Sequence, residues 1–145
     1  MQLAGTRAKI QPKDQDVVAR KSLSAQRVKQ DKAVPNNRTA VLQLLQVINV
    51  KLDNQAPKRH NSYARDLPQA LRPIAVTATG GAHPVGSVPQ LQDAGGIFPG
   101  TVQQLLTLSP AQLDELRAFY NDDFGNQVGD GVEIQRHKFA MYIGW

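Results

Sequence analysis

The sequence contains no cysteine, which excludes disulfide bonds and thiolate metal sites. Aromatic residues are scarce early in the chain, and Tyr63 alone precedes residue 98. Long apolar runs are missing too, because polar residues interrupt the most apolar stretch, residues 39–52. That stretch is too short and too polar to span a bilayer, and no apolar secretory signal begins the chain. We therefore expect a soluble protein, cytoplasmic or within a particle assembled there, without membrane contact.

Charge is divided between two halves of the chain. Residues 1–66 contain 13 of the 17 Lys and Arg residues and 5 of the 12 Asp and Glu residues, a local charge of +8. Residues 67–145 contain the other 4 basic and 7 acidic residues, a local charge of −3. A basic segment with few aromatic residues can bury little apolar surface, whereas the second half has the large side chains for a small core.

Residues 1–38 are predicted to form an extended basic arm that binds a partner. Cations of this density suit an acidic protein surface or phosphates, because such contacts need charge but little geometry. The arm has no aromatic residue, which argues against base-specific recognition of nucleic acid. Its few aliphatic residues favour a helix only when the arm is docked. The predicted partner-binding residues are Arg7, Lys9, Lys13, Val17, Val18, Arg20, Lys21, Leu23, Arg27, Val28, Lys29, Lys32 and Arg38.

Residues 39–52 form the most periodic segment of the first half. Five aliphatic residues follow the i, i+3, i+4, i+7, i+11 spacing of a helix face, and an overlapping set fits the alternation of a strand. The abundance of Leu and Gln favours one long helix, capped by Thr39 or Asn37, and a strand stays open. The helical set is Val41, Leu44, Leu45, Ile48 and Leu52.

The middle of the chain is predicted to be largely irregular. Residues 53–72 are typical of a polar connector, with a helical turn around Pro68. Residues 74–79 are the best candidate for a short strand, which Gly80 and Gly81 would end. Residues 80–100 contain six glycines and three prolines and predict a long loop, a type of segment that is often functional or packed on a neighbour.

Residues 101–145 are predicted to form a small helical unit. One short helix fits residues 100–108, and Ser109, Pro110 and Gln112 form the start signal of the next, with a capping Ser and Pro at the first helical position. Residues 132–143 favour a last helix, with a strand again open. The sequence thus predicts a mainly α protein with irregular segments, divided into 1–38, 39–79, 80–100 and 101–145.

No motif points to catalysis, a metal or a cofactor. Residues 123–125 match a kinase tripeptide, but the accompanying Gly-rich loop and strand lysine are missing. Residues 122–133 have the length of a calcium loop, but Phe124 and Gln127 stand where an oxygen ligand and a glycine are needed. The three histidines lie far apart and favour surface or packing roles over a zinc site. We predict a protein that is not an enzyme and has no catalytic residue, metal ligand or cofactor.

Two functional hypotheses remain. The leading one is a structural or assembly subunit of a larger multi-protein complex, such as a virion or tail-like particle, with other protein subunits in many copies as partners. The arm and the Gly/Pro-rich loop would be its interaction segments, and frequent Gln and Asn residues suit hydrogen-bonded interfaces. The alternative is a nucleic-acid-associated protein that contacts phosphates non-specifically through the arm. No small-molecule substrate is evident.

Overall fold

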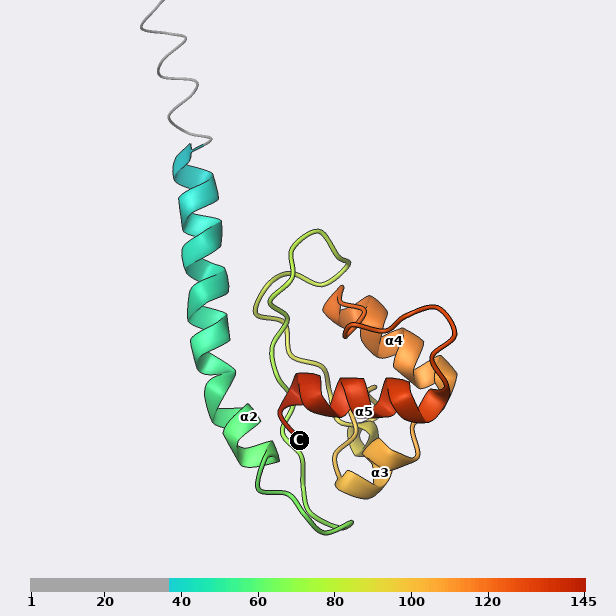
Figure 1. The fold of residues 1–145 in the computed structure, drawn as a ribbon. Helices are drawn as coiled ribbons and strands as arrows, with labels where there is room; N and C mark the ends of the chain where they lie inside the picture. Colours follow the sequence, from blue (N-terminus) through green and yellow to red (C-terminus); the bar gives the residue numbers. More distant parts are fainter. Residues whose placement is uncertain (1–36) are drawn as a thin grey trace, which may run out of the picture. The chain divides into compact units, whose positions relative to one another are not determined.

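The computed structural model describes residues 37–145, which are mainly helical with irregular connections (Figure 1). The chain divides into two units, Met1–Leu42 and Gln43–Trp145. In the first unit, the described residues 37–42 are helical and exposed. In the second unit the helix continues to residue 53. The elements that follow are α2 (Gln55–Asn61), the 3-10 helix η1 (Gln92–Ala94), α3 (Val102–Leu106), α4 (Pro110–Tyr120) and α5 (Val132–Ile143).

The helix over residues 37–53 confirms the helical interpretation of residues 39–52. Asn37 and Thr39 already lie inside the helix, so the prediction that either caps it is wrong. The helix is interrupted at Asn54, because Pro57 has no N–H to donate to the Asp53 carbonyl. Helical structure resumes at once, since the Asn54 carbonyl accepts a hydrogen bond from the Lys58 backbone at 3.1 Å.

Helix α2 corrects the prediction of a polar connector over residues 53–72. Its sequence, QAPKRHN, has no apolar stripe, and its one buried residue is Asn61. Hydrophobic periodicity does not predict a helix whose buried residue is a polar side chain. Residues 62–71 are irregular, with turns at 62–63 and 67–68, and do not form the expected helical turn around Pro68.

Residues 74–79 do not form the predicted strand. Ile74 and Val76 are buried, as alternation predicts, but only Val76 exchanges backbone hydrogen bonds with a neighbouring segment, at 2.8 Å with Ser87 and 2.9 Å with Gly86. Side chains satisfy much of the remaining backbone: the Tyr120 hydroxyl donates to the Ile74 carbonyl at 3.0 Å. Within residues 37–145 the only β pairings are isolated bridges at 70 with 101 and at 91 with 98.

The C-terminal helices confirm the predicted helical unit. Ser109 caps α4 in a capping box: its hydroxyl accepts from the Gln112 backbone at 3.3 Å, and its backbone N–H donates to the Gln112 side chain at 2.8 Å. Pro110 occupies the first helical position. Residues 132–143 form a helix, which confirms the favoured interpretation of that segment over the strand alternative.

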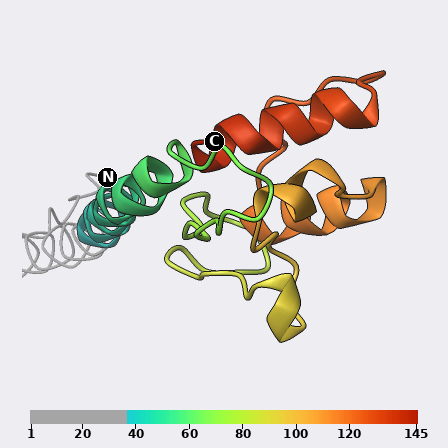
Figure 2. The same cartoon turned by 90° about the horizontal axis from the view of Figure 1, so that it is seen from below.

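The core of the second unit is built around α5, which contacts α2, α3 and α4. Both ribbon views place the C-terminal end of α5 beside α2 (Figures 1 and 2). Middle segments contribute as well, so the core is wider than residues 101–143. Its largest fully buried side chains are Ile74, Phe98, Leu105, Leu108, Leu113, Leu116, Tyr120, Phe139 and Ile143. Burial raises the pKa of the Tyr120 hydroxyl well above its ordinary value of 10.0, which keeps this hydroxyl a hydrogen-bond donor.

Candidate interaction surface

Within the second unit, four large aliphatic side chains are exposed on the helix over residues 37–53. Leu44, Leu45, Ile48 and Leu52 have exposed fractions of 63, 50, 51 and 64%. At about 100° per residue, they occupy an arc of about 100° around the helix. We call these four residues the apolar stripe. In the first unit, Val41 and Leu42 are also exposed.

The buried face of the same helix points elsewhere. Val50 and Asn54 are the buried residues of this region, with exposed fractions of 9 and 4%. The same helical geometry puts their mean direction about 150° from the centre of the apolar stripe. The stripe is therefore not the rim of the core, but a separate apolar surface on the far side of the helix.

Two buried asparagines hold the inner face in place. The Asn54 side chain donates to the Ala75 carbonyl at 2.8 Å and accepts from the Ala75 N–H at 2.7 Å. The Asn61 side chain makes the same pair of bonds with Arg72, at 3.0 and 2.8 Å, and also donates to the Ile143 carbonyl at 2.9 Å. Each amide thus bonds to both the N–H and the carbonyl of one backbone residue, Ala75 or Arg72, as a neighbouring strand would.

The spacing of these asparagines matches the segment that they bind. Residues 54 and 61 are seven positions apart, which is about 10 Å along a helix. Residues 72 and 75 are three positions apart, which is about 10 Å along an extended chain. This match fixes the inner face to the core and leaves the apolar stripe outward. Sequence reasoning missed both residues; Asn at i and i+7 in a helical stretch was the available signal.

Of the thirteen residues predicted to bind a partner, only Arg38 lies within residues 37–145. Arg38 lies in the first unit, in the helix, and is exposed. The other twelve, from Arg7 to Lys32, lie outside the described residues. The apolar stripe contains none of the thirteen. Its periodicity is plain in the sequence, but periodicity alone predicts a helix face and not whether that face is covered.

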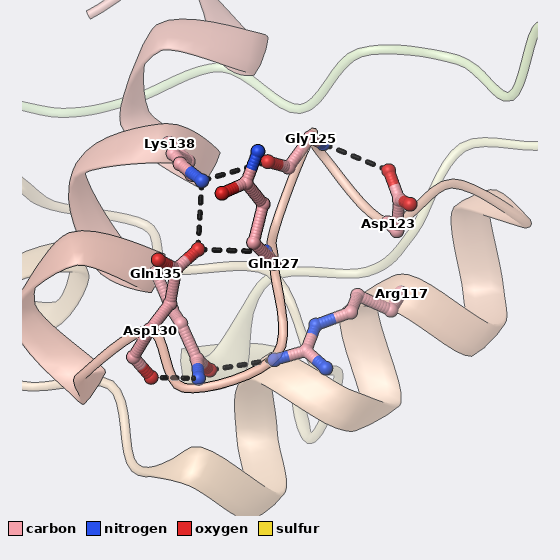
Figure 3. Close-up of polar contacts among 7 residues, drawn as sticks. All are labelled: Arg117, Asp123, Gly125, Gln127, Asp130, Gln135 and Lys138. Carbon is pink, nitrogen blue, oxygen red and sulfur yellow. Dashed lines mark hydrogen bonds and ion pairs between the residues drawn. The ribbon is translucent and has the colours of Figure 1, made fainter.

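The loop between α4 and α5 is held by a polar network (Figure 3). The Lys138 ammonium group donates to the Asp130 carboxylate and to the Gly125 carbonyl, each at 2.7 Å. The Asp130 carboxylate also accepts from the Gln127 backbone at 2.7 Å. The hydrogen bond from Lys138, followed by the one from Gln127, holds the pKa of Asp130 below its ordinary value.

A second set of contacts ties this loop to both helices (Figure 3). Arg117 of α4 donates to the Gln135 side chain at 2.6 Å, and Gln135 donates to the Asp130 carbonyl at 2.8 Å. The Asp123 carboxylate accepts from the Gly125 backbone at 2.8 Å. Asp123 and Asp130, two of the acids in the segment with calcium-loop length, therefore serve to close a turn. In the part of the chain that the structure describes, no group of three or more His, Cys, Asp or Glu residues could hold a metal ion.

The three histidines lie apart in the structure and have different surroundings. The His83 ring stacks on Phe119, with 4.0 Å between ring centroids. A ring nitrogen of His60 lies 3.1 Å from the Ala70 carbonyl, and His137 is exposed on α5. Phe119 itself is half-buried and packs against the edge of the core.

Comparison with protein-family models, with curated proteins and with solved structures finds no match for this chain. None of the helices over residues 37–145 combines the length and the apolar character needed to cross a membrane.

Proposed function

We propose that the chain is a non-enzymatic structural subunit whose copies associate through the apolar stripe within a multi-copy complex. The observation that carries this proposal is the exposure of Leu44, Leu45, Ile48 and Leu52 on the side of the helix away from the core. Contiguous exposed aliphatic side chains favour a protein contact, because covering them removes apolar surface from water.

The spacing of the stripe favours a second copy of the chain as its partner. Leu45, Ile48 and Leu52 are separated by three and four positions, and Val41 lies four positions earlier. This is the a/d alternation of a two-stranded coiled coil. In a parallel, in-register pair, residues 44 and 51 of one copy would face residues 49 and 56 of the other. These facing pairs are Leu with Asn and Lys with Ala, so no like charges meet.

The energetics favour many copies over a free dimer. Covering the exposed half of a Leu or Ile side chain contributes about 0.8–1.5 kcal/mol, since full burial contributes about 1.5–3 kcal/mol. Eight such side chains in a pair therefore contribute about 6–12 kcal/mol, against an association cost of about 4–15 kcal/mol. An isolated pair is weak, and a particle that holds many copies at high local concentration makes the contact persistent.

Analytical ultracentrifugation of the full chain over a range of concentrations tests this proposal. We expect the wild type to shift from monomer toward dimer as concentration rises, and Ile48→Asp to stay monomeric with unchanged circular dichroism. Gln43→Asp adds the same charge to an exposed position off the stripe and should dimerise like the wild type. A wild type that stays monomeric up to the highest soluble concentration, or an Ile48→Asp chain that dimerises as the wild type does, would refute self-association through the stripe.

Cross-linking tests the orientation. The chain has no native cysteine, so single-cysteine variants report unambiguously. Facing residues at one level of a parallel pair lie close enough for a disulfide, whose Cα atoms are about 4.4–6.8 Å apart. Leu45→Cys should then cross-link to itself and Gln43→Cys should not. Efficient dimerisation of a Leu45→Cys chain that never cross-links would exclude the parallel arrangement.

The same variants separate this proposal from the nucleic-acid alternative. Phosphate binding through the basic arm would weaken steeply as salt rises. It would also survive Ile48→Asp, because that substitution lies outside the arm.

A further inference from the structure

A polar cavity lies between residues 51–58, residues 74–77 and the C-terminal end of α5. Its volume is about 300 Å³. Two lysines, two hydroxyl groups and two amides line it, together with one apolar wall. The lining residues are Lys51, Asn54, Gln55, Lys58, Ile74, Thr77 and Tyr142. All of them belong to the second unit.

The hydrogen-bond donors of this cavity are unequally engaged. Asn54 is committed to the Ala75 backbone, and the Gln55 side chain donates to the Lys51 carbonyl at 3.4 Å. Lys51 and Lys58 are seven positions apart, so their side chains share one side of the helical path. The Tyr142 hydroxyl bonds to the Thr77 hydroxyl, and this pair retains a proton that can be donated outward.

Lys58 is the least satisfied group in the cavity. Its side chain is half-buried, and its ammonium nitrogen lies 5.3 Å from the centre of the Tyr142 ring. The ion pairs within residues 37–145 are Arg117 with Asp114 and Lys138 with Asp130, so neither includes Lys58. Burial lowers the pKa of Lys58, and the more distant Asp122 carboxylate opposes that shift. A partly desolvated cation therefore faces the cavity without a bonded counter-ion.

We propose that this cavity binds the phosphate group of a small molecule, held by Lys51 and Lys58 and by hydrogen bonds from Thr77 and Tyr142. An ammonium group serves phosphate as a point charge, and charge-assisted hydrogen bonds are stronger than neutral ones. Ile74 and the Tyr142 ring offer an apolar wall to the organic part of the ligand. The volume corresponds to about ten water molecules at about 30 Å³ each, which suits a phosphate monoester.

Titration of the full chain with inorganic phosphate tests the proposal, with sodium chloride at equal ionic strength as the blank. Nuclear magnetic resonance follows the Thr77 methyl and Tyr142 ring signals. We expect both to move saturably with phosphate and to stay still with chloride. Saturable movement confined to other residues, or no movement at all, would overturn the proposed site.

Matched variants assign the binding to the lysines. Lys58→Met and Lys51→Met keep most of the aliphatic stem and remove one charge each. Each should weaken phosphate binding about tenfold, as expected for the loss of a charge-assisted hydrogen bond. Arg59→Met removes the same charge from an exposed neighbour in α2 and should change affinity less than about twofold. Equal losses in all three variants would show general charge attraction and overturn the proposal. Lys51 is exposed, so its variant remains informative even where Lys58→Met alters the fold.

Discussion

Two helices of this protein carry the same spacing of apolar residues and meet opposite environments. Leu45, Ile48 and Leu52 are separated by three and four positions and have exposed fractions of 50, 51 and 64%. In α4, Leu113, Leu116 and Tyr120 have the same separations, and each has an exposed fraction of 0%. The difference lies in what packs against each helix, since α5 covers the apolar face of α4.

An amphipathic pattern therefore predicts which face of a helix is apolar, but not what packs against that face. The helix over residues 37–53 joins the core through the opposite side, where polar Asn54 is buried. Its hydrogen bonds to Ala75 satisfy the amide, so that burial carries little penalty. The apolar stripe is thereby left exposed.

The largest expected effect is a difference in stability between substitutions of a buried leucine in α4 and of an exposed leucine in the apolar stripe. Leu116→Ala should destabilise the chain by about 2–5 kcal/mol, because it leaves a cavity in the core. Leu44→Ala should change stability by less than about 0.5 kcal/mol in the monomer, because its side chain is already exposed. Urea denaturation at low protein concentration measures both. Similar losses would mean that the stripe is covered within the monomer.

A second substitution tests the polar anchor. Asn61→Ala should cost about 1–3 kcal/mol, because the backbone groups of Arg72 and the Ile143 carbonyl lose their buried partner. Asn49→Ala makes the same change at an exposed position and serves as the control. Thermal and urea denaturation give the two values. If the two variants were equally stable, the hydrogen bonds of Asn61 would not be what holds α2 against the core.

A third substitution tests the local start of α4. Ser109→Ala removes the capping side chain and should cost about 1 kcal/mol, within the usual range of about 0.5–2 kcal/mol. Ser62→Ala, which removes a hydroxyl bonded to the exposed Arg59 carbonyl, should cost less. Urea midpoints compared at constant slope measure the difference. A larger loss for Ser62→Ala would contradict the importance of the capping box.

The smallest effect concerns the loop between the two packed helices. Lys138 and Gln127 hold the pKa of Asp130 below its ordinary value of 3.8. A carboxylate with a depressed folded pKa adds stability above its unfolded pKa and loses it as pH falls through the folded value. Asp130→Asn should therefore destabilise the chain at pH 7 and reduce the loss on acidification below pH 3.8. Asp53→Asn makes the same change at an exposed helix position and serves as the control. Overlapping profiles for wild type and Asp130→Asn would exclude this role.

Local signals determined several of the helices, but not α2. The periodicity of residues 39–52, and the Ser109, Pro110 and Gln112 start signal, predicted segments that are helical in the structure. Such signals act within one or two turns, where backbone bonding and capping are decided. The missing cysteines likewise excluded disulfides without any knowledge of the fold.

Tertiary structure decided what the helices face. Residues 74–79 alternate like a strand, but no strand of residues 37–145 lies alongside, and Asn54 and Tyr120 bond to their backbone instead. The Lys58 cavity is assembled from residues that are far apart in the chain, and the outward direction of the apolar stripe follows from burial of the opposite face. These features depend on which distant segments of the chain pack together. The periodicity within one segment does not predict that packing.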